Sequence, residues 1–242
     1  MGCCSGNSTI ENEDDKKQFH NLSEEEKNKI KKEIEEQDKN LESKEVERPS
    51  AENYDWIGLL AKLPVKKTKE EREQRLKLWK KLNEYGNGYL SYKRLSFQIE
   101  KYLELPGVLA DKGPVKLAFD AASDKYVRYG LKKEDNLIEW MEFRIFLVYL
   151  KQYFEYYIMF NELDKSQDNK ISVEEFKKAI PKMKNWGVEI NESNAEKEFN
   201  LIDSNGSGTI NFEEFCNYAI KKSLDKEEDI GFDNTELKNL KK

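Results

Sequence analysis

The strongest constraint in this sequence is an internal repeat, in which Asp164 of one copy corresponds to Asp203 of the next, an offset of 39 residues. FNELD (160–164) matches FNLID (199–203), and ISVEEF (171–176) matches INFEEF (210–215). Apolar residues at helical spacing lie on both sides of a polar loop in each copy. The repeat therefore predicts that one helix–loop–helix unit is used twice.

The polar loop of each copy carries oxygen atoms at the spacing that a calcium ion requires. Calcium prefers six to eight oxygen ligands, and a twelve-residue EF-hand loop supplies them from positions 1, 3, 5, 7, 9 and 12, with a sharp turn at position 6. The later loop has Gly208 at the turn, and its ligands would be Asp203, Asn205, Ser207, Thr209 (through its carbonyl), Asn211 and Glu214. The earlier loop has Asn169 at the turn, and its ligands would be Asp164, Ser166, Asp168, Lys170 (through its carbonyl), Ser172 and Glu175.

These two loops predict two bound Ca²⁺ ions. Asparagine is one of the few residues that tolerates a left-handed backbone, so Asn169 is compatible with the turn. The alternative is a pair of acidic surface turns. Two complete matches to the EF-hand ligand pattern, in tandem and flanked by phenylalanines, argue against it. The Asp164 loop has three carboxylates and the Asp203 loop has two, which favours tighter binding in the first, although the better turn at Gly208 would act in the opposite direction.

An earlier unit has the same rhythm but lacks the ligands. Asn83 stands at position 1, Tyr85 at position 3, Asn87 at position 5 and Gly88 at position 6. Position 12 is Arg94, a cation where a bidentate anion is needed. We therefore expect this hand to be a structural partner that does not bind calcium.

A second degenerate unit is expected between this hand and the intact pair. Ile138, Glu142 and Phe143 align with Ile171, Glu175 and Phe176 of the Asp164 loop. Counted from Phe119, the loop is longer than twelve residues; aligned without a gap, it has Leu131 and Lys133 at positions 1 and 3, which cannot chelate. This hand is also expected to be structural.

The predicted fold is all-α, with two pairs of EF-hands and a flexible, charged N-terminal leader. The leader covers residues 1–50 and includes a possible solvated helix at Glu24–Lys39. An N-terminal lobe with degenerate loops follows at 51–137, its second hand completed by 138–150. The C-terminal lobe covers 138–223 and the tail 224–242, and the stretch 138–163 is expected to form one helix that links the second and third hands.

Composition narrows the classes of function. The chain has 48 acidic and 42 basic residues and a net charge of −6, which argues against nucleic acid as a partner. Its single histidine, His20, lies in the leader, and the sequence contains no Walker loop, GxSxG or HExxH motif. We therefore expect no enzymatic activity. Three cysteines, two at the N-terminus and Cys216 far away, indicate no disulfide framework.

The first residues, MGCCSG, resemble an acylation signal. Removal of Met1 would expose Gly2 for myristoylation, with Cys3 and Cys4 beside it for palmitoylation, although Gly6 stands where the motif usually has Ser or Thr. One myristoyl chain binds membranes only marginally, at roughly 10⁴ M⁻¹, and a second chain makes anchoring stable. The alternative is an unmodified leader with two incidental cysteines.

Together these features resemble the flagellar calcium-binding protein family (calflagins) of protozoa. The resemblance rests on the Met-Gly-x-Cys type start, on two degenerate hands before two intact ones, and on EFR (142–144), MFNELD (159–164) and AIPKMKNWG (179–187). It implies a dually acylated calcium sensor on the inner face of the ciliary or flagellar membrane, whose surface and contacts with membrane or protein change with calcium. The protein target is unknown. The remaining alternatives are a calcium buffer that does not open, favoured by the low methionine content, and a regulatory subunit or scaffold.

Overall fold

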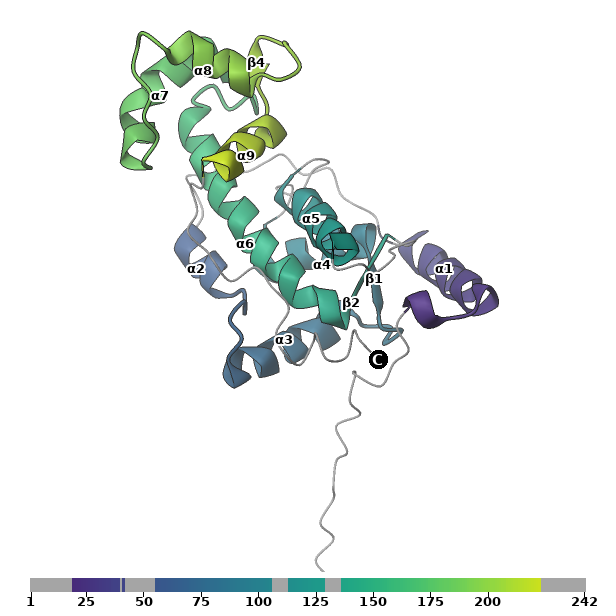
Figure 1. Cartoon of the computed structure of the whole chain (residues 1–242). Coiled ribbons are helices and arrows are strands. Elements are labelled where there is room, and N and C mark those ends of the chain that lie inside the picture. The colour runs from purple at the N-terminus through teal and green to yellow at the C-terminus, as the bar shows by residue number, and fades with distance from the viewer. Residues whose placement is uncertain (1–18, 40, 42–54, 106–112, 129–135, 223–242) are drawn as a thin grey trace, which may run out of the picture.

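The computed structural model describes residues 19–39, 41, 55–105, 113–128 and 136–222 of the chain. These residues are mostly helical, with four short strands in two antiparallel pairs. The fold is therefore all-α with two pairs of EF-hands, as the sequence predicted (Figure 1). Its elements are η2 (Phe19–Asn21), α1 (Glu24–Lys39), α2 (Trp56–Ala61), α3 (Lys69–Leu82), β1 (Tyr89–Ser91), α4 (Tyr92–Leu103), α5 (Pro114–Arg128), β2 (Leu137–Glu139), α6 (Trp140–Leu163), β3 (Ile171–Ser172), α7 (Val173–Asn185), α8 (Ala195–Ile202), β4 (Thr209–Ile210) and α9 (Phe212–Lys221).

Each pair of hands is joined by a short antiparallel strand contact between its two loops. In the N-terminal lobe β1 pairs with β2, and Leu90 faces Ile138. In the C-terminal lobe β3 pairs with β4, and Ile171 faces Ile210. Leu90, Ile171 and Ile210 stand at position 8 of their loops, and the pairing of Leu90 with Ile138 agrees with the alignment of Ile138 with Ile171.

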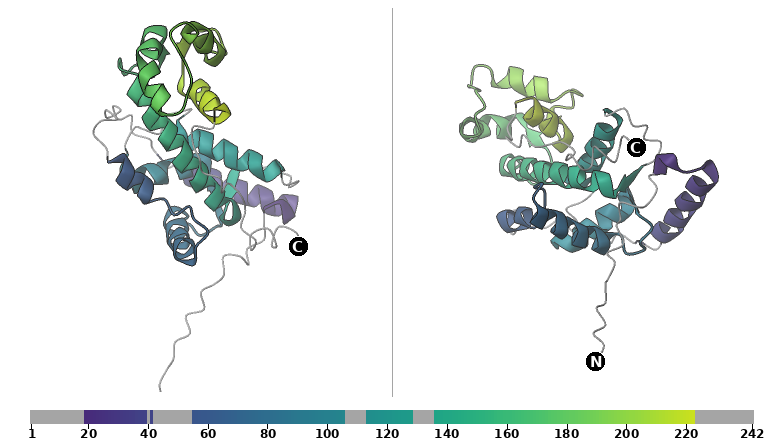
Figure 2. Two further views of the ribbon diagram at one scale, coloured as in Figure 1. Left: turned by 60° about the vertical axis from the view of Figure 1, so that its left-hand side comes forward. Right: turned by 60° about the horizontal axis from the view of Figure 1, so that its bottom comes forward.

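Helix α6 is one continuous helix of 24 residues that serves both lobes. It leaves the second hand after β2 and enters the third hand at Asp164, as the sequence predicted for the stretch 138–163, except that residues 138 and 139 belong to β2 and the helix begins at Trp140. Figures 1 and 2 show it as a rod with the N-terminal hands at one end and the C-terminal hands at the other. Most of its residues are buried, which is why its sequence is apolar on nearly every face.

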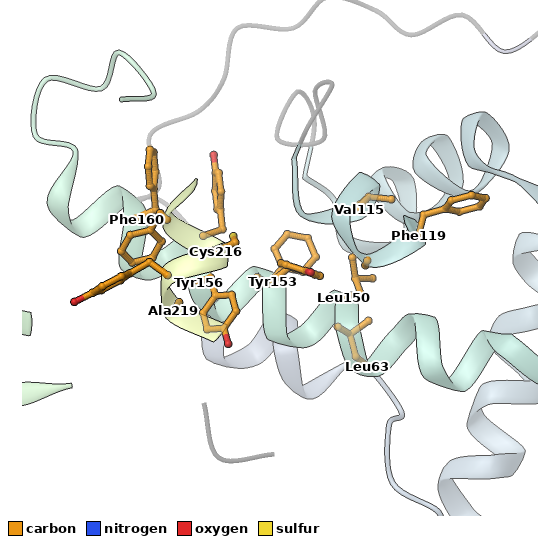
Figure 3. Packing of buried hydrophobic residues seen from close by; sticks show 14 of the residues in the cluster. Leu63, Val115, Phe119, Leu150, Tyr153, Tyr156, Phe160, Cys216 and Ala219 are labelled. Atoms are coloured by element: carbon orange, nitrogen blue, oxygen red, sulfur yellow. The ribbon is translucent and has the colours of Figure 1, made fainter. Parts of the chain in front are cut away.

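A single large apolar core follows this helix from one lobe to the other. Figure 3 shows Val115 and Phe119 of α5 toward one side of the core, and Cys216 and Ala219 of α9 toward the other. No helix in the described ranges combines the length and the apolar character that crossing a membrane requires.

The leader contributes an ordered helix with the bounds that the sequence suggested, Glu24–Lys39. One face of α1 is covered, because Ile34 and the preceding Phe19 form a small apolar cluster with Tyr89 of β1 and Leu137 of β2. The opposite face is charged and exposed, as expected for a solvated helix. Residues 1–18 and 42–54 of the leader lie outside the described residues.

Helix α2 packs on the middle of α6, a contact that the sequence did not predict. The indole of Trp56 lies 5.9 Å from the ring of Tyr157 and 6.2 Å from that of Phe154, measured between ring centroids. The N-cap of α2 is Asp55, whose side chain accepts a hydrogen bond from the backbone N–H of Gly58 at 3.0 Å. Trp56 is therefore a packing residue.

Candidate metal centre

Both intact loops share a backbone shape that turns the chain twice. Position 4 has a positive φ in each loop, 60° at Gln167 and 67° at Gly206. Position 6 does as well, 64° at Asn169 and 78° at Gly208. The prediction that Asn169 occupies a left-handed turn is confirmed. The left-handed Gln167 was missed, and its only signal in the sequence was the glycine at the same position of the sister loop.

Asp164, the first carboxylate of the earlier loop, is enclosed by the backbone of that loop. Asp164 is only 4% exposed, and its Oδ2 accepts a hydrogen bond from the backbone N–H of Asn169 at 2.9 Å. The hydroxyl of Ser166 donates to Oδ1 at 3.1 Å. Burial raises the pKa of Asp164, and the neighbouring Asp168 adds to the rise, while these hydrogen bonds oppose it. The loop therefore holds a desolvated negative charge that a cation would stabilise.

The last carboxylate of this loop folds back over its beginning. Glu175 Oε1 accepts hydrogen bonds from the backbone N–H groups of Ser166 at 2.9 Å and Lys165 at 3.0 Å. Oε2 accepts from the N–H of Ser172 at 2.9 Å, which closes a capping box at the start of α7. Burial alone would raise the pKa of Glu175, but the bonds from Ser172 and Ser166 leave it below its usual value.

The later loop repeats this arrangement. Asp203 is 7% exposed and accepts from the N–H groups of Gly208 at 2.8 Å and Ser207 at 2.9 Å. Glu214 is 6% exposed and accepts from the N–H groups of Asn205 at 3.2 Å and Asn211 at 3.0 Å, the latter within a capping box of α9. In both loops, positions 9 and 12 are thus the N-cap and third residue of the exiting helix.

The remaining ligand candidates line the same two loops. Asp168 Oδ1 accepts from the N–H of Lys170 at 3.0 Å, and Asn205 Oδ1 accepts from that of Ser207 at 2.8 Å. The Ser207 hydroxyl donates to the carbonyl of Thr209, the predicted carbonyl ligand, at 2.9 Å. All twelve predicted ligand residues lie in these two described loops.

The donor set fits a hard divalent cation. Its atoms are carboxylate, hydroxyl, amide and carbonyl oxygens, the ligands that calcium prefers. Within the described residues, no three His, Cys, Asp or Glu side chains converge on one metal position. In each loop the carboxylates at positions 1 and 12 instead accept hydrogen bonds from backbone N–H groups. Many of the other predicted ligand atoms are serine, asparagine and backbone carbonyl oxygens.

Comparisons with known proteins agree with this arrangement. The family model described as the FCaBP EF-hand domain matches residues 59–150, and an EF-hand domain pair matches residues 154–220. The flagellar calcium-binding protein TB-24 of Trypanosoma brucei brucei is 36% identical over 172 residues, which are 70% of this chain and 77% of that protein. The chain belongs to the flagellar calcium-binding protein family.

Other flagellar calcium-binding proteins match over a similar segment. The protein from Trypanosoma cruzi is 31% identical over 175 residues, 72% of this chain and 82% of its own length. TB-44A of Trypanosoma brucei brucei is 36% identical over 70% of this chain, but the match spans only 41% of that longer protein. A solved structure of a homolog of programmed cell death 6 protein from Leishmania major Friedlin covers 74% of this chain and 94% of its own, with 14% identity and a TM-score of 0.33.

The first hand of this family member keeps the loop but replaces the ligand. Gly86 and Gly88 have φ values of 62° and 89°, as at positions 4 and 6 of the intact loops. Arg94 occupies position 12 and is 2% exposed. A guanidinium group therefore lies where an intact loop has its glutamate.

Several predicted sites lie outside the described part of the chain. These are the acylation candidates Gly2, Cys3 and Cys4, and Leu131 and Lys133 of the second loop. The cysteine in the last hand is described: Cys216 is 1% exposed, and burial raises the pKa of its thiol well above the usual value. A buried thiol of this kind is unreactive.

Proposed function

We propose that this chain is a calcium sensor that binds two Ca²⁺ ions, one in each loop of the C-terminal lobe. The observation that carries the proposal is the pair of complete loops in which a nearly buried aspartate at position 1 and a glutamate at position 12 close on the same turn of backbone. Bound calcium supplies a divalent positive charge that compensates the carboxylates of each loop. Family membership supports the same assignment.

The two ligand glutamates connect the loops to the helices that leave them. Glu175 lies in the first turn of α7 and Glu214 in the first turn of α9, so any movement of their carboxylates re-aims these helices. Helix α9 packs on α6 through Phe212, whose ring centroid lies 5.6 Å from those of both Tyr157 and Phe160. A change in the direction of α9 would uncover part of this aromatic surface, which is the response that defines a sensor.

We further propose that N-terminal acylation tethers the sensor to the inner face of a membrane, that of a cilium or flagellum. Gly2 would carry a myristoyl group and Cys3 and Cys4 palmitoyl groups, the two signals that stable anchoring requires. The similar proteins are named flagellar, which supports the location. The bound protein target is unknown, and neither an enzymatic role nor a nucleic-acid partner is proposed.

A calcium buffer is the second candidate function. The chain has only four methionines, whereas adaptable target-binding grooves are often rich in methionine. A buffer would bind both ions without uncovering apolar surface. A regulatory or scaffold subunit is the third candidate, and it would hold its partner equally well with and without calcium.

Fluorescence of a dye that binds apolar surface separates the sensor from the buffer. We expect calcium to increase dye binding to the wild-type chain and to have no effect on the double variant Glu175→Gln/Glu214→Gln. The matched control is Glu174→Gln/Glu213→Gln, which removes the same charge from the adjacent, exposed glutamates and should respond like the wild type. If the wild type binds calcium and dye binding stays constant, the sensor proposal is wrong and the buffer remains.

Flotation with liposomes tests the anchor separately. Chain produced together with the acyltransferases should float with the vesicles. Gly2→Ala should stay in the soluble fraction, and Cys3→Ser/Cys4→Ser should float only weakly, because one chain binds membranes marginally. Unchanged flotation of Gly2→Ala would refute the anchor without affecting the calcium proposal.

A further inference from the structure

The loop of the first hand contains a buried cation of its own. The guanidinium carbon of Arg94 lies 4.3 Å from the centroid of the Tyr85 ring, in a cation–π contact. Its Nη1 lies 3.5 Å from a carboxylate oxygen of Glu84, which is half exposed. Because Arg94 is only 2% exposed, its charge needs a closer and better-shielded anion than Glu84 provides.

The leader helix supplies that anion. Asp38, in the last turn of α1, lies 3.2 Å from Nη2 of Arg94, although 56 residues separate them in the sequence. The other oxygen of the same carboxylate accepts a hydrogen bond from the hydroxyl of Ser91, at position 9 of the loop. Asp38 is 9% exposed, so this pair is largely shielded from water and from salt.

Neighbouring residues extend the contact around the end of α1. The ammonium group of Lys93 donates to the backbone carbonyl of Asp38 at 2.6 Å, and the backbone N–H of Leu41 donates to the same oxygen at 3.1 Å. The amide of Asn87, at position 5 of the loop, donates to Gln37 at 3.4 Å. Polar side chains at positions 5, 9 and 12 of the degenerate loop thus all contact α1 near its C-terminal end.

An apolar contact fixes the other end of the leader segment. Phe19 is 1% exposed, and its ring meets that of Tyr89 edge to face with centroids 5.5 Å apart. Its backbone N–H donates to Glu139 at 3.1 Å, and Ile34 completes the cluster with Leu137. The covered surface is the outer side of the β1–β2 pair, where Figure 1 shows α1 lying.

We propose that the first hand is a calcium-independent binding site for an acidic amphipathic helix, and that its occupant is α1 of the same chain. In this site Arg94, at the position of the intact loops' glutamate, is the resident cation, and Asp38 is the carboxylate that it binds. The hand has therefore exchanged calcium binding for the docking of the leader. The proposal does not depend on calcium binding by the C-terminal lobe or on acylation.

Hydrogen exchange of the full chain, measured by mass spectrometry in calcium and in chelator, tests the site. We expect the amides of α1 to be protected in both conditions. Asp38→Ala and Phe19→Ala should each speed α1 exchange by roughly ten- to a hundredfold, because each removes one half of the contact. The matched control Glu36→Gln removes a negative charge from the exposed face of the same helix and should leave exchange unchanged.

The pairing of Asp38 with Arg94 is tested by a double-mutant cycle. If the two side chains bind each other, Asp38→Ala/Arg94→Gln should exchange in α1 no faster than the faster single variant. Protection of α3 and α4 in Asp38→Ala and Phe19→Ala should match the wild type, which shows that the lobe stays folded. Fast α1 exchange in the wild type, protection that requires calcium, or an Asp38→Ala variant that behaves like Glu36→Gln would each overturn the proposal.

Discussion

At the scale of single residues, the calcium loops depend on a few backbone positions with positive φ. Gly208 has a φ of 78°, and a Cβ atom added there would meet no atom within 4 Å beyond the glycine itself and its two chain neighbours. The cost of a side chain at this position is therefore purely conformational. Asn169 adopts nearly the same φ in the sister loop, 64°, because asparagine is among the residues that enter the left-handed region most easily.

This comparison predicts an order of effects at position 208. Gly208→Ala should weaken calcium binding by the Asp203 loop about five- to thirtyfold, equivalent to the roughly 1–2 kcal/mol that an ordinary residue loses in the left-handed region. Gly208→Asn should lose clearly less. Isothermal titration of both variants checks the order, with the untouched Asp164 loop as the internal reference. Equal losses would show that φ does not limit this loop.

At the scale of elements, α6 and α9 hold the C-terminal lobe together through aromatic contacts. Phe160, in the last turn of α6, is 2% exposed, and its ring centroid lies 5.7 Å from that of Phe215 in α9. Leu201, on α8, is 65% exposed. The two residues have side chains of broadly similar character in opposite environments.

Truncation of these two side chains should therefore give very different results. Phe160→Ala should lower the free energy of unfolding by about 3–5 kcal/mol, since it removes buried surface and leaves a cavity. Leu201→Ala should change it by less than about 0.5 kcal/mol. Urea unfolding followed by circular dichroism measures both. A loss at Leu201 as large as that at Phe160 would contradict the description of this core.

The sequence predicted those elements whose signal is local and repeated. The two intact loops follow from a repeat with fixed spacing, and the continuous α6 was expected where one stretch, 138–163, links the second hand to the third. The docking of α1 was not predicted, because Asp38 and Arg94 are far apart in the chain and one charge in a charged helix carries no signal of its partner. The candidate ligands were predictable because all of them come from two twelve-residue segments.

At the scale of the whole molecule, the first hand and the two hands of the C-terminal lobe have different roles. The first hand holds a guanidinium at position 12 and contacts the leader, whereas the two hands of the C-terminal lobe have glutamate there. The lobes share α6, so they are joined by a helix and by a common core.

We therefore predict that calcium slows hydrogen exchange chiefly in α7–α9 and their loops, and leaves exchange in α1, α3 and α4 nearly unchanged. Equal slowing in both lobes would contradict this difference between the hands.

Calcium titration by isothermal calorimetry tests the central claim most directly. The wild type should take up two ions, and Glu175→Gln and Glu214→Gln should each weaken the affinity for one of them. Loss of a residue that only hydrogen-bonds to a metal ligand costs roughly 10- to 100-fold in metal affinity, and loss of a ligand itself should cost at least as much. The double variant should bind neither at micromolar calcium, while Glu174→Gln/Glu213→Gln should titrate like the wild type. Failure of the folded wild-type chain to take up calcium between micromolar and millimolar concentrations would contradict the account.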